Sequence, residues 1–448
     1  MTGSRKQGFR TFKARLRGLP MVCKATAILA VIILVRIGSS YPLPFVNQDY
    51  MRMILGIQGL AFLNSITGGS MQQMSFFALS ISPYITASII MQLMTVVFPS
   101  LEEMQKDGKT GRERFKHITQ GVAVTLSAIQ SVAMAVGLGA RGLLVSYTPA
   151  TVVAASVIWS IGAIVLIGIS SFLDWLEVGR GISILLCANI LSTFPSDVFA
   201  LRDMFVSGKI PAVAVLNACL IVAAFLAVIS VCVTAASTYK DVPVVNSRKM
   251  AGRLDKSSFP IPLNTCSVMP VIFASSILSL PIIVSQFTGT AQSGVPMHIM
   301  RCLTTGEWFK PEQPLYTVGA FLYFGLTTLF TYFYLDIGFN PYEIADNLKK
   351  SGATIPGIRP GVLTVEYIRK TSTRIALAGN TATMLLILAM HAVCNIYRLG
   401  GQGIAGTSVI ILVGVVIEER RLLASLAVVN GFSKRSKKGG GFCENGKR

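Results

Sequence analysis

The sequence predicts an all-helical protein that crosses a membrane about ten times. Hydrophobic residues make up 52% of its 448 positions and charged residues only 13%, about half the charged share that is usual in soluble domains. About ten apolar stretches are each long enough to cross a hydrocarbon core of roughly 30 Å as a helix. Most basic residues lie between these stretches. Lipid is therefore the expected solvent of most of the chain.

The predicted spans follow one another along nearly the whole chain. They cover residues 22–41, 74–98, 117–138, 149–172, 180–195, 211–236, 264–285, 314–336, 374–396 and 406–425. The first span is expected to be retained, because residues 1–24 carry seven Lys or Arg and no small-residue cleavage site follows. Five spans on each side of the 237–260 loop allow two pseudo-symmetric five-helix halves with a pathway between them.

The basic residues predict the orientation of these spans. With the N-terminus in the cytoplasm, 32 of the 40 Lys and Arg residues fall on the cytoplasmic side. Lys and Arg next to a span resist translocation, so both termini are expected in the cytoplasm. The same distribution argues against nucleic acid as the target of the +20 net charge, because the basic residues form no single face.

The loops and tails complete the predicted organisation. The expected units are a cytoplasmic basic N-terminus at 1–21, an N-terminal half at 22–195, an external loop at 196–210, a C-terminal half at 211–425 with cytoplasmic loops at 237–260 and 337–373, and a cytoplasmic basic tail at 426–448. Residues 54–67 are too few to cross and too apolar for an exposed loop. We expect them to form a re-entrant segment packed inside the protein, where irregular backbone is tolerated at membrane depth.

The spans contain almost no ionisable residues. The nearby acidic residues all lie at predicted cytoplasmic ends: Asp174, Glu177, Asp336, Glu418 and Glu419. An ion-coupled transporter usually needs a carboxylate inside the membrane, so this class is disfavoured.

The remaining segments show no pattern of an enzyme. Residues 107–111 resemble the end of a phosphate-binding loop, but Glu103 stands where that motif needs glycine. The sequence has no metal-ligand cluster and no nucleophile with a base partner. Its eight cysteines have no paired spacing and are expected to be buried hydrophobes. We expect no enzymatic activity, no cofactor and no metal.

A resemblance to a known family rests on residues 77–93, which read FALSISPYITASIIMQL. This segment closely resembles the second-helix signature of the SecY family, the channel-forming subunits of the bacterial Sec protein translocase. Further similar segments are 101–103 with 111–112, 270–277, 340–341 with 345–352, 356–361 and 406–408. The likeness covers nearly the whole chain. It implies an hourglass channel between two halves, closed by a ring of aliphatic side chains and by a small plug helix.

The resemblance assigns residues to these parts. The implied pore ring is Ile81, Ile85, Leu186, Ile190, Ile272 and Ile411. The implied plug is about 56–74. The implied lateral gate lies between the second and seventh spans, with a polar cluster at Thr86, Gln130 and Asn264. A narrow aliphatic constriction dewets and blocks ions, but each residue taken alone fits ordinary core packing better, and only the resemblance favours the pore.

The resemblance also implies a function and partners. The chain would pass unfolded polypeptides across the cytoplasmic membrane of a bacterium and release hydrophobic segments sideways into lipid. The implied partners are SecE-like and SecG-like small membrane subunits, the SecA motor ATPase, the ribosome, signal sequences, nascent chains and membrane lipid. The residues implied in cytoplasmic docking are Arg248, Lys249, Arg253, Lys349, Lys350 and Arg359. For the individual lysines, plain positive-inside topology is the simpler explanation.

Three departures from the family pattern indicate a divergent member. The 240–247 loop is less basic than usual, the 174–181 connection is short, and the 434–448 tail is rich in glycine. Two alternatives remain: a polytopic transporter of small solutes, and a structural or assembly membrane protein without a pore. A polar substitution of Ile85 or Ile411 separates the last of these from a channel, because only a channel would then leak ions.

Overall fold

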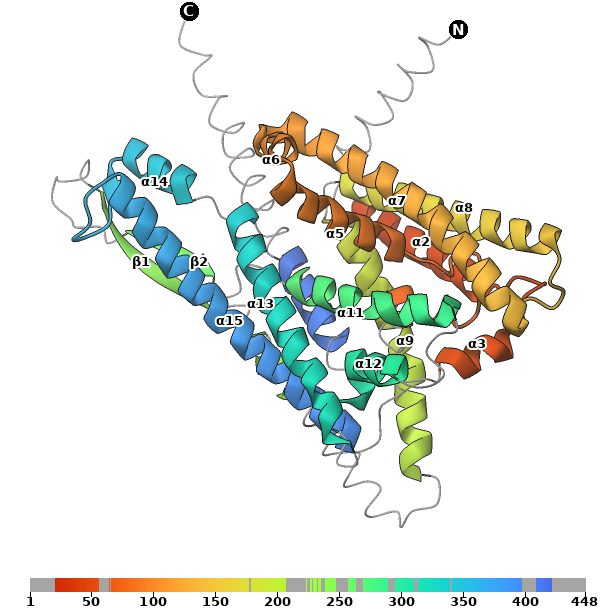
Figure 1. The fold of residues 1–448 in the computed structure, drawn as a ribbon. Coiled ribbons are helices and arrows are strands. Elements are labelled where there is room, and N and C mark those ends of the chain that lie inside the picture. The colour runs from red at the N-terminus through yellow and green to blue at the C-terminus, as the bar shows by residue number, and fades with distance from the viewer. Residues whose placement is uncertain are drawn as a thin grey trace, which may run out of the picture.

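The computed structural model consists mainly of long helices arranged in two bundles (Figure 1). It describes residues 21–55, 64, 66–176, 179–206, 223, 226–227, 229–231, 233–234, 238–246, 257–262, 269–288, 295–309, 313–338, 341–396 and 408–420. The predicted sixth span at 211–236 therefore lies largely outside the described residues.

The first bundle comes from the N-terminal part of the chain. Its elements are α2 (Met21–Ser40), α3 (Gln48–Leu55), α5 (Ser82–Val97), α6 (Pro99–Lys106), α7 (Gly108–Leu138), the π-helical turn η2 (Gly139–Leu143), α8 (Pro149–Trp175) and α9 (Gly181–Val206). Helix α7 packs against both α5 and α8, and α9 packs against α8.

The second bundle comes from the C-terminal part. Its elements are α11 (Met269–Thr288), α12 (Val295–Leu303), the 3₁₀ turns η5 (Thr305–Glu307) and η6 (Pro314–Thr317), α13 (Val318–Gly338), α14 (Pro341–Lys350), α15 (Val362–Ile396) and a helix at 408–420. Helix α13 packs between α11 and α15, and α11 also packs against α5 and α7 of the first bundle. The two bundles thus meet along α11.

Several of these helices are suited to lipid. Within the described residues, five segments are long and apolar enough to cross a membrane: Cys23–Ser40, Thr110–Leu143, Pro149–Trp175, Pro314–Leu335 and Val362–Val393. Helix α5 and the start of α6 would make a sixth, but they are bent by 113°. Two shorter apolar helices, Gly181–Pro195 and Met269–Ile282, lie in α9 and α11. The protein is therefore a multi-pass membrane protein.

The second span begins later than the sequence predicts. Residues 68–81 form tight turns, and α5 begins only at Ser82. Met74 and Ser80 have φ angles of 47° and 48°, a left-handed conformation that a right-handed helix cannot contain. Pro83 lies in the first turn of α5, where its missing N–H leaves no helical hydrogen bond unmade. The eight residues before α5 are therefore available for other contacts.

Other helices are longer than predicted. Helix α7 begins at Gly108 and α15 at Val362, each well before its apolar stretch. Helix α9 continues through Pro195 to Val206, so part of the predicted external loop at 196–210 is helical. Hydropathy finds only the part of a helix that matches the bilayer, and polar turns that extend beyond it carry no such signal.

A small sheet joins the two loops of the C-terminal half that the sequence predicts to be cytoplasmic. Strand β1 (Tyr239–Asn246) pairs antiparallel with β2 (Ser257–Pro262) and, at Val245 and Asn246, with β3 (Ala353–Thr354). Val242 and Val244 are buried, whereas their neighbours along β1 are exposed, the period of two that a half-buried strand shows. Val242 packs in a separate cluster with Ala345, Ile355, Ile368 and Ile375. The loops, α14 and the first turns of α15 thus have a core of their own.

Candidate functional site

Six aliphatic residues from both bundles lie in one contiguous core cluster. Ile81 immediately precedes α5 and Ile85 lies in its first turn, Leu186 and Ile190 are on α9, Ile272 is on α11, and Ile411 is on the 408–420 helix. All six are buried, with 0 to 7% of their surface exposed. All belong to the same cluster, which also contains side chains of α2, α8, α13 and α15. The structure thus brings together every residue of the predicted ring.

The turns that lead into α5 pack beside this cluster and are held by hydrogen bonds from two helices. The side chain of Asn189 on α9 donates to the backbone oxygen of Ile66 at 2.9 Å and to the hydroxyl of Ser80 at 3.0 Å. The guanidinium of Arg36 on α2 donates to the backbone oxygen of Gly68 at 2.9 Å and to Oδ1 of Asn189 at 2.7 Å. Two side chains therefore fasten both ends of residues 66–80.

Gly68 permits the closest of these approaches. Its φ is +66°, and a Cβ at this position would lie 2.2 Å from Nη2 of Arg36 and 3.0 Å from the Cα of Asn189. Any side chain would displace the guanidinium and strain the backbone.

The predicted plug is described only in part. Its residues 56–63 and 65 lie outside the described residues, and the part that is described lies against α2 and α9.

The predicted gate residues are only partly observed. Thr86 is on α5, where its hydroxyl donates to the backbone oxygen of Ser82 in the same helix at 3.1 Å. Gln130 is half-buried on α7. Asn264 lies outside the described residues, so the predicted polar cluster of three stays a prediction. Helices α5 and α11, which would form the gate, are nevertheless in contact.

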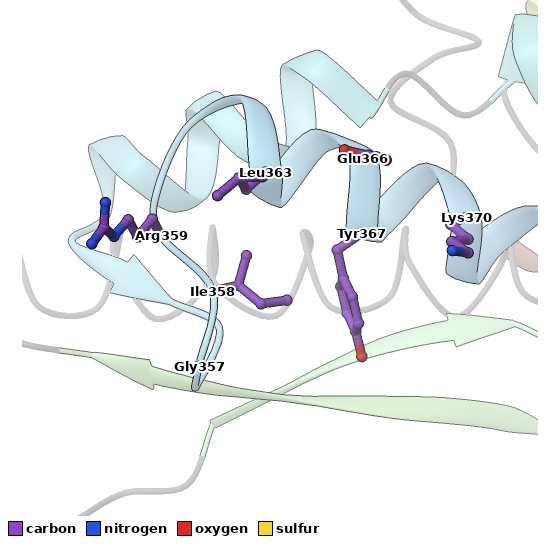
Figure 2. A pocket seen from close by; sticks show the side chains of 7 residues that line it. All are labelled: Gly357, Ile358, Arg359, Leu363, Glu366, Tyr367 and Lys370. Atoms are coloured by element: carbon purple, nitrogen blue, oxygen red, sulfur yellow. The ribbon is translucent and has the colours of Figure 1, made fainter.

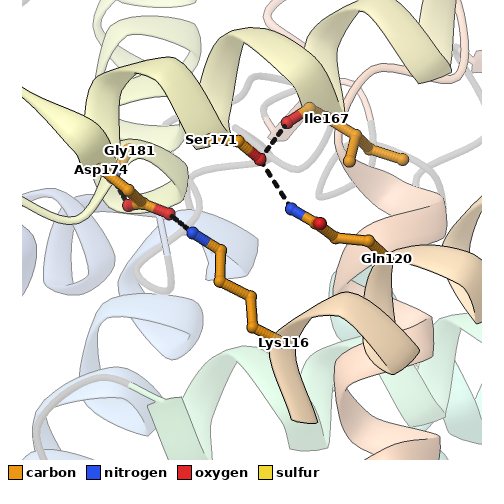
Figure 3. A network of polar contacts seen from close by, with 6 residues as sticks. All are labelled: Lys116, Gln120, Ile167, Ser171, Asp174 and Gly181. Carbon is orange, nitrogen blue, oxygen red and sulfur yellow. Dashed lines mark hydrogen bonds and ion pairs between the residues drawn. The ribbon is translucent and has the colours of Figure 1, made fainter. Parts of the chain in front are cut away.

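A second polar network joins α7, α8 and α9 (Figure 3). Lys116 on α7 forms an ion pair with Asp174 on α8. The other oxygen of Asp174 accepts the backbone N–H of Gly181, the first residue of α9, at 2.6 Å, where a helix N-terminus favours negative charge. One turn along α7, Gln120 donates to the hydroxyl of Ser171 at 2.6 Å. Spacings of three and four residues place these pairs on facing sides of the two helices.

The turn between α8 and α9 also contacts the opposite bundle. The guanidinium of Arg180 lies 2.9 Å from a carboxylate oxygen of Glu418, and its backbone N–H donates to Glu419 at 3.0 Å. At Gly179, a Cβ would lie 1.8 Å from Oε2 of Glu419. Only glycine therefore lets this carboxylate lie so close to the backbone. The short connection therefore joins the N-terminal half to the 408–420 helix.

The predicted docking residues lie on the sheet and α14 side of the molecule or are not described. Arg248, Lys249 and Arg253 lie outside the described residues. Lys349 and Lys350 are exposed at the end of α14. Lys350 pairs with Asp346 one turn earlier at 2.6 Å, and the hydrogen bond and charge of this carboxylate raise the pKa of Lys350.

Arg359 borders a surface hollow of about 460 Å³ (Figure 2). The hollow lies between the turn at 357–359 and the first turns of α15. Arg359 and Lys370 lie at its two ends, with Tyr367 and Glu366 between them. Ile358 and Leu363 supply its apolar part. Its lining thus has a basic residue at each end, with apolar side chains, Tyr367 and the acidic Glu366 between them.

Several of these functional residues were not found from the sequence. Arg36 carried no signal beyond being one of few basic residues on the predicted external side. Asn189 interrupts a short apolar span, and an amide in an apolar helix indicates a hydrogen-bond partner elsewhere. The valine alternation of β1 was a usable signal for the sheet.

Together, fold and site define a class of protein: a multi-pass helical membrane protein whose two halves meet at an aliphatic cluster. The SecY family model matches residues 75–419. The protein translocase subunit SecY of Streptomyces galbus is 33% identical over 424 residues, which cover 89% of this chain and 92% of that protein. The chain therefore belongs to the SecY family.

Solved structures agree in fold. A structure that describes the plug domain of SecY as stabilising the closed state of the translocation channel is similar with a TM-score of 0.65 and 18% identity, covering 88% of this chain and 90% of that one. Sec61 in the canine ribosome–channel complex from the endoplasmic reticulum has a TM-score of 0.61 and 17% identity, covering 89% and 90%. The SecY-like fold predicted from the sequence is confirmed.

Family membership also confirms the general function. The chain is a channel subunit of the Sec protein translocase and belongs to a family of channels, not of enzymes. The predicted roles of individual residues are a separate matter.

Proposed function

We propose that unfolded polypeptides pass between the two helical bundles and that the six aliphatic residues close this route at rest. One observation carries the proposal: residues from four separate segments of both halves are buried together in a single cluster. A ring made from both halves can widen when the halves move apart. Side chains of one helix pair could not do so.

The chemistry of the cluster suits this role. Aliphatic side chains make a narrow passage dewet, which stops ions and water without a specific bond to a passing chain. A polar or charged ring would hold water and leak. The six residues carry no polar atom in their side chains, and they belong to a buried cluster that includes helices of both bundles.

The segment that includes residues 66–74 is proposed as part of the plug, together with the preceding residues from about 56. Ile66 belongs to the same buried cluster as the ring candidates, and its backbone oxygen accepts from Asn189 on α9. The similar structure in which the SecY plug stabilises the closed channel supports this assignment.

Helices α5 and α11 are proposed as the two sides of a lateral gate. They belong to different bundles and touch each other, so their separation would open a path from the channel into lipid for a hydrophobic segment. The hydroxyl of Thr86 donates within its own helix and can still accept a hydrogen bond, and Thr86, Gln130 and Asn264 are proposed as the polar cluster of this gate.

The sheet, α14 and the start of α15 are proposed as the docking site for the ribosome and the SecA motor. Arg359 and Lys370 lie at the ends of one hollow there, and the similar Sec61 structure is of a ribosome–channel complex. SecE-like and SecG-like subunits would lie against the lipid-facing helices. The chain is proposed to reside in the cytoplasmic membrane of a bacterium with both termini in the cytoplasm, as its Lys and Arg distribution favours.

Planar-bilayer conductance tests the ring. The complex is reconstituted with Ile411→Asn, and the control is Ile410→Asn, which changes the neighbouring isoleucine of the same helix and the same cluster. We expect a raised resting conductance only for the substitution at Ile411, because only this side chain is assigned to the ring. Equal conductance in both variants would favour a membrane protein without a pore at this position.

Crosslinking tests the path of the polypeptide. A photoreactive residue replaces Ile81 or Ile272, and a stalled secretory chain is engaged in the channel. We expect crosslinks from both positions and none from Leu173 on α8, which is buried in the same cluster but is not assigned to the ring. Crosslinks from Leu173 alone would move the route elsewhere.

A further inference from the structure

The polar contacts around residues 66–80 form one unit centred on Asn189. This side chain is 3% exposed, and its amide group donates both to Ile66 and to Ser80 while its oxygen accepts from Arg36. Loss of Asn189 would thus remove the hydrogen bonds at both ends of the segment and the acceptor of Nη2 of Arg36. Asn189 also precedes Ile190 of the proposed ring on α9, so the polar unit and the aliphatic constriction share a helix.

Arg36 is an unusual partner for this unit. Within the described part of the chain its guanidinium makes no ion pair, and its acceptors are a backbone oxygen and an amide oxygen. Its Nε is buried and has no hydrogen-bond partner among the residues that the structure describes. A guanidinium that has no carboxylate partner in a low-dielectric region is destabilised unless other acceptors bind its N–H groups. The carbonyl of Gly68 is one such acceptor, and it is available only while the segment is in place.

The polarity of these groups determines when the segment can leave. In a dry channel, withdrawal would leave Nη1 of Arg36 and the amide nitrogen of Asn189 without the acceptors that the segment supplies, which is unfavourable. In a channel filled with water, water molecules can replace each of these hydrogen bonds. The same contacts are therefore strong in the closed channel and weak in the wetted one.

We propose that Arg36 and Asn189 act as a clamp that positions residues 66–80 in the closed channel and couples their release to wetting of the route. This inference rests on the proposed function, because it takes residues 66–80 as part of the closing segment. The clamp residues are positioning residues: they act on the segment and not on the passing polypeptide. Gly68 is the position that makes the contact with Arg36 possible.

Labelling of a buried cysteine measures release of the segment. Ser70 is 1% exposed, so a cysteine introduced there by Ser70→Cys should react slowly with a membrane-impermeant maleimide added outside. The reconstituted complex without this change gives the background from the native cysteines. Arg36→Met and Asn189→Leu remove the polar groups at similar size, and each should raise the labelling rate about tenfold, as expected for loss of roughly one net hydrogen bond.

The controls separate a clamp from general damage. Asn380→Leu removes another buried asparagine, on α15, whose side chain donates to Thr328 at 3.0 Å, and it should leave the labelling rate unchanged. Arg36→Lys keeps the positive charge and one donor nitrogen, so its labelling should be almost as slow as with the native Arg36. The double variant Arg36→Met with Asn189→Leu should label no faster than the faster single variant, since both act through one unit.

Three results would overturn the clamp: unchanged labelling in both single variants, faster labelling in Asn380→Leu as well, or multiplied effects in the double variant. The proposed ring has its own test in Ile411→Asn. If that variant leaks while the clamp variants label slowly, the clamp alone is wrong. If the clamp variants label fast while Ile411→Asn does not leak, the ring assignment is wrong and the clamp is retained as the anchor of residues 66–80.

Discussion

The polar contacts beside residues 66–80 and those at the α8–α9 turn differ in how their charges are balanced. Beside residues 66–80, Arg36 is bound by a backbone oxygen and an amide. At the turn, Asp174 is paired with Lys116, and Glu418 is paired with Arg180. The first group holds one short segment, whereas the second connects three helices of one bundle to the 408–420 helix of the other.

The difference teaches how a channel can have a mobile part and a stable frame in one membrane. Contacts of a cation with neutral acceptors can be replaced by water, so a segment held this way can be released when water enters. Contacts between opposite charges lose more when one partner is removed, above all at Asp174, which also accepts the backbone N–H of Gly181. We therefore expect the α8–α9 contacts to affect stability and the contacts of Arg36 to affect closure.

The largest effect is expected at Gly68. Gly68→Ala places a methyl group on the guanidinium of Arg36 at a positive φ, and we expect the closed state to lose about 2–4 kcal/mol. Gly69→Ala is the matched control, because its φ of +80° gives similar strain but no atom lies within 4 Å; it should cost about 1 kcal/mol. The labelling rate of Ser70→Cys and the resting conductance measure the effects of the two glycine substitutions. Equal effects would mean that strain, and not the contact with Arg36, determines closure.

The next effect concerns Asp174. Asp174→Ala removes the ion pair with Lys116 and the acceptor for Gly181, and it should lower the free energy of unfolding by about 1–3 kcal/mol. Asp174→Asn keeps an acceptor for the backbone N–H and should cost less. Thermal unfolding of the purified complex in detergent measures the loss. A raised resting conductance without a loss of stability would break the comparison, because this network would then control closure.

A smaller effect is expected at Arg180. Its side chain is 58% exposed, so solvent screens the pair with Glu418 and Arg180→Ala should cost about 0.5–1 kcal/mol. The loss should shrink in concentrated salt, which screens exposed charges. The double variant Arg180→Ala with Glu418→Ala should be no less stable than the less stable of the two single variants. Additive losses would indicate that the two residues act separately.

The smallest effect is expected at Lys350. Its side chain and that of Asp346 are 73% and 55% exposed, and Lys350→Met should leave the unfolding temperature unchanged. Because Asp346 raises the pKa of Lys350, any stability from the pair is present below the ordinary lysine pKa and is lost only as the pH rises through the raised value. Near neutral pH, the unfolding temperature should therefore show no pH dependence that arises from this pair. Reduced binding of ribosomes to Lys350→Met would support docking as its role.

The sequence predicted well what depends on local pattern. Apolar stretches identified α2, α8 and α13 closely, because each matches the thickness of the bilayer. The resemblance at 77–93 and 270–277 led to Ile81 and Ile272, which lie in one cluster.

What the sequence missed depends on contacts between distant segments. The bonds of Asn189 join residues more than 100 positions apart, and no local period encodes them. The turns before Ser82 were predicted as helix because their apolar residues fit either structure. The polar first turns of α7 and α15 lie beyond the apolar stretches, where hydropathy gives no information.

The pairing of β1 with β3 has a mechanical consequence. Strand β1 follows the sixth span, β3 follows α14, and β2 ends at Pro262 shortly before α11 begins at Met269. Hydrogen bonds between strands resist sliding more than an unpaired loop does, so the sheet is a stiff connection between the surface near Arg359 and the segment that leads to α11, the helix proposed as one side of the gate. A large partner that binds this surface would therefore act on α11 through the sheet. The hydrogen bonds of three short strands would limit the force that is transmitted.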